Sequence, residues 1–89
     1  MAEKWSVFFH QDFCKDLKKL DKPVASRVID AVERLGTFDT PPAHCKALTG
    51  QLAGLWRYRV GDYRVIIDFD KNHLVIVALG VDHRSKVYR

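Results

Sequence analysis

Residues 56–67 read Trp56-Arg57-Tyr58-Arg59-Val60-Gly61-Asp62-Tyr63-Arg64-Val65-Ile66-Ile67, and this stretch predicts a tight β-hairpin. Gly61-Asp62 is a two-residue turn sequence whose glycine readily adopts a positive φ, and alternating aromatic and β-branched residues flank it. With this turn, Arg59 lies opposite Arg64. Since successive strand side chains point to opposite faces, one face carries Trp56, Tyr58, Val60, Tyr63, Val65, Ile67 and Phe69, and the other carries Arg57, Arg59, Arg64 and Asp68.

The second face of this hairpin gathers arginines, an arrangement that opposes folding. Like charges directly opposite one another destabilise a sheet by up to about 1 kcal/mol, so packing does not explain the Arg59–Arg64 pair. A bound phosphate would remove the cost, because the planar guanidinium fork matches phosphate oxygens. The alternative interpretation is a solvated basic face that Asp68 and other carboxylates partly neutralise.

The whole chain has the size of one small domain, covering residues 1–89. Its 89 residues are 47% hydrophobic, enough for a single core without metal or disulfide cross-links. The net charge is +4, and the excess lies in residues 55–89, which carry seven Lys/Arg against four Asp/Glu. This asymmetry favours an anionic partner, either a nucleic acid or an acidic protein.

The cysteines and histidines predict no disulfide framework and no metal site. Cys14 and Cys45 are isolated thiols, as is typical of a reducing compartment. The histidines form no short zinc-ligand spacing with them. No stretch resembles a signal peptide or a membrane span. We therefore expect a cytoplasmic protein with no cofactor, no metal and no membrane contact.

Upstream of the hairpin, the sequence predicts one strand and two helices. Residues 5–9 are aromatic-rich and alternate as a strand does, and residues 11–20 have apolar side chains at helical spacing. Pro23 suits the first turn of a second helix that ends at a Gly36 C-cap. Residues 37–54 predict a loop with a short strand around 46–48.

Downstream of the hairpin, residues 74–79 are apolar on both faces and predict a central strand. The polar residues 81–89 are expected to leave the sheet. The order is β-α-α-β-β-β, an α+β fold with a small, mostly antiparallel sheet. A two-helix hairpin packs on the Trp56/Tyr58/Ile67 face and leaves the arginine face open as a groove.

The tail adds an imidazole and a phenol to these arginines. If it folds back, His83, Arg84 and Tyr88 reach the basic face. Cleavage of RNA by its own 2′-hydroxyl needs a base, an acid and charge that stabilises the phosphorane. Histidine titrates near neutral pH, arginine binds phosphate, and tyrosine can stack on an unpaired base. A merely solvated His83 and a Tyr88 that anchors the tail by packing are the alternatives.

Together these segments resemble the RelE/ParE superfamily of type II toxin-antitoxin toxins. The resemblance covers nearly the whole chain and rests on the element order and three motifs: Lys46-x-Leu48-x-Gly50, Leu55-Trp56-Arg57-Tyr58-Arg59-Val60-Gly61-Asp62-Tyr63-Arg64-Val65-Ile66 and His83-Arg84-Ser85-Lys86-Val87-Tyr88. It implies a small toxin that a cognate antitoxin wraps and neutralises. RelE-like members cleave mRNA in the ribosomal A site without metal, whereas ParE-like members inhibit DNA gyrase without being enzymes.

The resemblance also implies roles for individual residues. Arg64 matches an arginine that holds the scissile phosphate, and Tyr88 matches a tyrosine that stacks on or orients the substrate. The predicted catalytic residues are Arg57, Arg64, His83 and Tyr88, and the predicted RNA or phosphate contacts are Lys46, Arg57, Arg59, Arg64 and Arg84.

Two departures from the family pattern keep alternatives open. Arginines stand at 57 and 59, where relatives often carry lysines, and arginine is a poor proton acceptor. Asp82 stands where some members carry an arginine, and an anion there would weaken phosphate binding. An mRNA endoribonuclease is the favoured function. A gyrase inhibitor and an inactive toxin that still binds its antitoxin are the alternatives.

Overall fold

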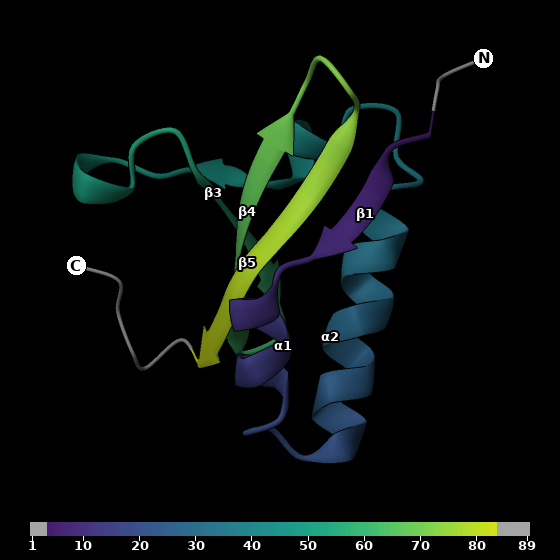
Figure 1. Cartoon of the computed structure of the whole chain (residues 1–89), viewed down its shortest axis with the longest axis vertical. Helices are drawn as coiled ribbons and strands as arrows, with labels where there is room; N and C mark the ends of the chain where they lie inside the picture. The colour runs from purple at the N-terminus through teal and green to yellow at the C-terminus, as the bar shows by residue number, and fades with distance from the viewer. Residues whose placement is uncertain (1–3, 84–89) are drawn as a thin grey trace.

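The computed structural model describes residues 4–83 of the chain (Figure 1). This part has an α+β fold in the predicted order β-α-α-β-β-β, with one further short strand before the hairpin. The helices and strands are β1 (Ser6–Phe9), α1 (Gln11–Leu17), α2 (Lys22–Leu35), β2 (Lys46–Ala47), β3 (Trp56–Val60), β4 (Tyr63–Asp70) and β5 (Val75–His83). Two 3-10 turns, Pro41–His44 and Gly50–Leu52, flank β2.

The strands form one mixed sheet in the order β1-β5-β4-β3-β2. Figure 1 shows β5 between β1 and β4, so the last strand in the chain is central in the sheet. All neighbouring pairs are antiparallel except β1 and β5, which run parallel. The two helices connect β1 to the rest of the sheet, as a parallel pair requires a crossover connection.

The β3–β4 hairpin has the register that its turn predicts. Arg59 pairs with Arg64, Tyr58 with Val65 and Trp56 with Ile67. Gly61 has a φ of +57°, in the left-handed region that glycine enters without strain. The turn therefore fixes which side chains share a face.

β5 is longer than the sequence predicts, and the expectation that residues 81–83 leave the sheet is wrong. Ile67 pairs with Ala78 but Ile66 pairs with Gly80, so Leu79 is a bulge with no partner on β4. An extra residue reverses the alternation of side chains beyond it. Val81 consequently returns to the buried face opposite Val65, and the strand continues to His83.

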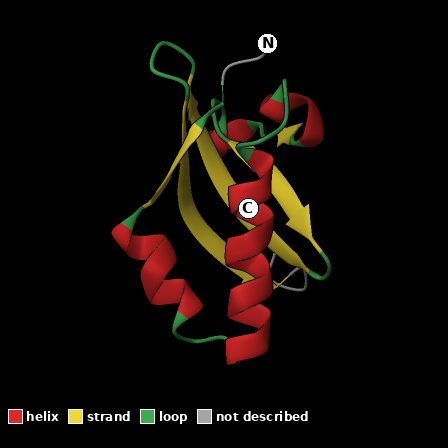
Figure 2. Cartoon of the chain, turned by 90° about the vertical axis from the view of Figure 1, so that its right-hand side faces the viewer, coloured by secondary structure: helices red, strands yellow, loops and turns green. Residues whose placement is uncertain are grey.

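The hydrophobic core lies between the helices and one face of the sheet, as expected. Figure 2 looks onto α2, which lies across the near face of the sheet. Its buried side chains Val28, Val32 and Leu35 pack in one cluster with sheet residues that include Val65, Ile67 and Ile76. Full burial of such a side chain contributes about 1.5–3 kcal/mol to stability.

α1 ends at Leu17, three residues earlier than the periodicity predicts. The backbone N–H of Lys19 donates to Asp16 and that of Leu20 to Leu17, so the chain tightens into i→i−3 turns. Leu20 nevertheless packs against the core, which is why its spacing resembles a continuing helix.

Gly36 ends α2 as predicted, but not because it adopts a left-handed conformation, since its φ is −67°. A Cβ at this position would lie 2.9 Å from the carbonyl oxygen of Trp5. The N–H of Trp5 in turn donates to the Gly36 carbonyl at 3.1 Å. The absence of a side chain therefore allows the start of β1 to pack directly on the end of α2.

Candidate nucleic-acid interface

Four of the predicted phosphate contacts lie in two neighbouring rows across the open face of the sheet. In the first row, Lys46 of β2 pairs with Arg57 of β3. In the second, Arg59 of β3 pairs with Arg64 of β4. Directly opposite side chains have Cβ atoms about 4.5–5.5 Å apart, and diagonal neighbours about 7–8 Å apart. We call Lys46, Arg57, Arg59 and Arg64 the basic rows.

These cations are accessible and carry a net positive charge. Lys46 and Arg59 are exposed, and Arg57 and Arg64 are partly exposed. Within residues 4–83, no carboxylate lies within ion-pair distance of the basic rows, since the ion pairs there are His10–Asp12 and Asp70–His73. The opposed Arg59 and Arg64 thus form no ion pair with a carboxylate of the described residues.

His83 lies on the other face of the sheet, away from the basic rows. It pairs with Tyr63, and the two rings meet edge to face with centroids 5.2 Å apart. Tyr63 packs against the helix-side core, so the His83 ring is on the helix side of β5. The bulge at Leu79 causes this placement, because a strand that alternated regularly beyond Ala78 would place His83 on the same face as Arg64.

A cavity of about 370 Å³ opens beside His83, between α1 and the end of β5. Charged and aromatic side chains line it: Asp16, Lys19, Tyr63, Asp82 and His83, with Leu20 and Val81. Sequence reasoning missed Asp16 and Lys19, which no short motif connects to the tail. The helical spacing of the sequence gives only the approximate position of Asp16, on the polar side of α1, and Lys19 lies in the turn after this helix.

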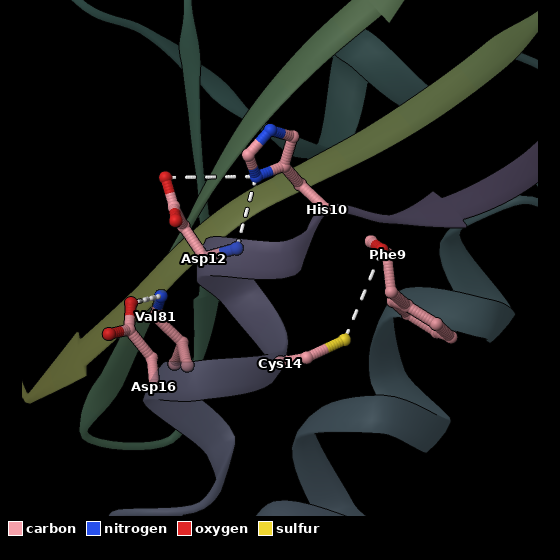
Figure 3. A network of polar contacts seen from close by, with 6 residues as sticks. All are labelled: Phe9, His10, Asp12, Cys14, Asp16 and Val81. Carbon is pink, nitrogen blue, oxygen red and sulfur yellow. Dashed lines mark hydrogen bonds and ion pairs between the residues drawn. The ribbon is translucent and has the colours of Figure 1, made fainter.

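Asp16 acts on the backbone of β5. Its Oδ2 accepts a hydrogen bond from the N–H of Val81 at 3.1 Å (Figure 3). The ladder with β1 ends where Phe9 pairs with Ala78, so within the described chain no strand covers the outer edge of β5 beyond that point. Asp16 therefore replaces a missing strand partner.

Next to the basic rows, the open face has an apolar hollow of about 290 Å³. It is lined mainly by Leu52, Leu55, Ile66 and Leu79, with Gly80 and Asp16 at its edge. Ile66 pairs with Arg57, which places the hollow directly beside the first row. The open face is therefore cationic toward β3 and apolar toward β5.

The aromatic residues of β3 belong to the core, as the alternation predicts. Trp56 and Tyr58 both pack against the core cluster. Burial, together with the nearby Cys45, raises the pKa of the Tyr58 phenol, and Arg34 opposes the shift. Burial raises the pKa of the Cys45 thiol to about 12.

Two of the predicted site residues, Arg84 and Tyr88, lie outside the described residues. Of the predicted residues in residues 4–83, the structure brings together Lys46, Arg57, Arg59 and Arg64 and separates His83 from them. In the same part of the chain, no three His, Cys, Asp or Glu side chains converge as metal ligands would. None of the described helices is both long and apolar enough to cross a membrane.

Comparison with known proteins identifies the family. Residues 7–88 match the family described as ParE toxin of type II toxin-antitoxin system, parDE. The chain is 33% identical over 86 residues to Toxin RelG of Mycobacterium tuberculosis, an alignment that covers 96% of this chain and 97% of that protein.

Solved structures agree with the sequence comparison. The toxin-antitoxin complex RelBE2 of M. tuberculosis contains a chain with a TM-score of 0.84 and 31% identity, covering 92% of this chain and all (100%) of that chain. A chain of the RelE-RelB complex of Pyrococcus horikoshii has a TM-score of 0.71 and 28% identity, with 96% and 100% covered. The protein thus belongs to the RelE/ParE superfamily and is a toxin of the type II toxin-antitoxin class.

Proposed function

We propose that this toxin is an endoribonuclease that cleaves mRNA on the ribosome. The basic rows carry the proposal: four cations form two directly opposed pairs on one sheet face, and no carboxylate of the described residues is in an ion pair with them. Such a face is costly unless an anion binds to it, and successive phosphates of an RNA backbone suit two neighbouring rows of cations.

The arginines supply binding and charge in the proposed reaction. Arg59 and Arg64 would hold the scissile phosphate between two guanidinium forks. As the 2′-hydroxyl oxygen attacks phosphorus, they would stabilise the added negative charge on the phosphorane oxygens. Arg57 and Lys46 would position the neighbouring phosphate. This division of roles needs no cofactor, because the cations come from the chain itself.

Proton transfer requires groups other than the arginines. His83 and Tyr88 are the proposed candidates, with Arg84 as a further phosphate contact. Because the His83 ring is on the helix side, RNA that binds the basic rows must present a ribose over the outer edge of β5 to reach it. This geometry predicts that the phosphate and the His83 imidazole lie on opposite faces of the sheet.

We further propose that a cognate antitoxin neutralises the toxin. Two solved relatives, one of M. tuberculosis and one of P. horikoshii, are complexes of a toxin with an antitoxin. Antitoxin carboxylates placed over the basic rows would compete with phosphate for the same cations. Because the proposed substrate is mRNA on the ribosome, the toxin would act in the cytoplasm.

A primer-extension map of mRNA in a translation extract tests the nuclease proposal. Wild type is expected to cut within codons, and Arg64→Ala is expected to lower the cut yield by about a hundredfold, the usual effect of removing one transition-state charge contact. Tyr88→Phe should also lower the yield. Arg27→Ala is the matched control, since Arg27 is an exposed arginine on α2. Equal yields from Arg64→Ala and Arg27→Ala would contradict the assignment of Arg64.

Inhibition of DNA gyrase is the second candidate, because the matching family description names the ParE toxin. A gyrase inhibitor would leave the mRNA intact and stop supercoiling of relaxed plasmid by purified gyrase. An inactive toxin would do neither and would still bind its antitoxin. The two assays together therefore separate the three functions.

A further inference from the structure

Asp82 of β5 lies directly opposite Arg64, at the end of the line that Arg59 and Arg64 begin. The pairing across β3, β4 and β5 places Arg59, Arg64 and Asp82 in one line on the open face. The row therefore has two cations and then an anion at the outer edge of the sheet. Asp82 occupies this position because of the bulge at Leu79, which turns residue 82 toward the open face.

The carboxylate of Asp82 is held at this edge by the backbone. Its Oδ1 accepts a hydrogen bond from the N–H of His83 at 2.8 Å. Two N–H groups on the outer side of β5, those of Val81 and His83, are thus each bound by a carboxylate, from Asp16 and Asp82 respectively. Asp82 also lines the cavity beside His83. It is therefore a fixed negative charge at the boundary between the basic rows and the cavity.

A fixed anion in this place has a defined effect on a nucleic acid. It repels a phosphate that approaches the β5 edge, while Arg59 and Arg64 attract a phosphate over β3 and β4. The phosphate is thereby restricted to the basic rows, and only an uncharged part of the nucleotide meets no repulsion at the edge.

We propose that Asp82 is a specificity-determining residue that weakens binding of free RNA and keeps its phosphates on the basic rows. This inference rests on the proposed nuclease function. A toxin that cuts mRNA only on the ribosome must bind free RNA weakly. Tight binding to free RNA would keep the toxin away from its ribosome-bound substrate. Asp82 lowers the affinity without removing a cation that the reaction uses.

Asp82→Asn tests this proposal with little change in shape, because the amide oxygen still accepts the hydrogen bond from His83. The matched control is Asp68→Asn, which removes the same charge from an exposed position on the same face of β4, outside the Arg59–Arg64–Asp82 row. The probe is a fluorescent single-stranded RNA 2′-O-methylated at every ribose, which cannot be cleaved through a 2′-hydroxyl. Fluorescence anisotropy over a series of KCl concentrations gives Kd and its salt dependence.

Asp82→Asn is expected to tighten binding by about fivefold and to steepen the slope of log K against log salt by about 0.7, the value for one added phosphate contact on a single strand. Asp68→Asn should change Kd by less than about twofold, an effect of net charge alone. In an Arg64→Ala background, the gain from Asp82→Asn should disappear, because the row no longer has its central cation.

Equal effects of Asp82→Asn and Asp68→Asn, or a gain that persists in the Arg64→Ala background, would overturn the proposal. If the wild type cuts mRNA in the extract and either of these results is obtained, only the role of Asp82 fails. If the wild type leaves mRNA intact while the binding pattern is as expected, the nuclease function fails and the control of anion binding by Asp82 stands.

Discussion

At the scale of single residues, carboxylates near the end of β5 bind backbone N–H groups. Asp16 reaches from α1 to Val81, and Gly80 leaves room for it, since a Cβ at Gly80 would lie 3.1 Å from Asp16 Oδ2. No sequence pattern predicts this contact, because the two residues are 65 positions apart. It depends on the helix ending beside an uncovered strand edge, which only the folded chain defines.

Asp16→Ala is expected to lower the free energy of unfolding by about 1–3 kcal/mol, because the N–H of Val81 loses its partner in a partly buried place. Asp16→Asn should cost less, since its amide oxygen still accepts. Urea unfolding measures both variants, and Asp39→Ala in an exposed loop is the control. Native-state exchange of the Val81 amide should quicken in Asp16→Ala. An unfolding energy equal to that of Asp39→Ala would contradict the assigned role.

At the scale of elements, the β3–β4 hairpin could be predicted pair by pair and β5 could not. A two-residue turn with a glycine fixes the register locally, so counting from Gly61 and Asp62 is sufficient. The position of a bulge depends instead on the packing of two strands against each other. The sequence of residues 74–79 is apolar throughout and contains no signal for Leu79, so the face on which His83 lies was beyond sequence reasoning.

The directly opposed arginines of this hairpin should lower the free energy of unfolding, although they are proposed to bind phosphate. Arg59→Gln is expected to raise the free energy of unfolding by a few tenths of a kcal/mol, and at most by about 1 kcal/mol, at low salt. In about 1 M KCl the gain should vanish, because the Debye length falls to about 3 Å. Urea unfolding at both salt concentrations measures this gain, and Arg27→Gln, at an exposed position on α2, is the control. A gain that persists at high salt would show that repulsion is not its source.

At the scale of the whole molecule, the two layers bury one face of the sheet and leave the other for binding. The alternation of residues 56–69 predicts this division, since the helices need an apolar face. The sequence could not predict the parallel pairing of β1 with β5, which joins distant ends of the chain. It also could not predict that Lys46 pairs with Arg57 in a strand of only two residues.

The layered packing predicts different reactivities for the two cysteines. Cys14 is exposed, whereas Cys45 is partly buried with its Sγ 3.7 Å from the Pro41 carbonyl oxygen. With the pKa of Cys45 raised to about 12, its thiolate is rare at pH 8. Iodoacetamide at pH 8 should modify native Cys14 at least about a hundredfold faster than Cys45, as mass spectrometry would show. In urea the two rates should become similar. Equal rates in the native protein would contradict the buried placement of Cys45.

The bulge at Leu79 has a consequence for how toxins of this kind diverge. Substitutions change one side chain at a time, but closing the bulge with no residue lost would shift the register of β5 beyond Ala78 by one position and exchange the faces of residues 82 and 83. The imidazole would then turn toward the arginines, and the carboxylate would turn toward the helices. Relatives that have the same number of residues in this strand but no bulge can therefore present a different set of catalytic groups on an unchanged scaffold. A sequence alignment would show no gap in this case and would assign the wrong residue to each role.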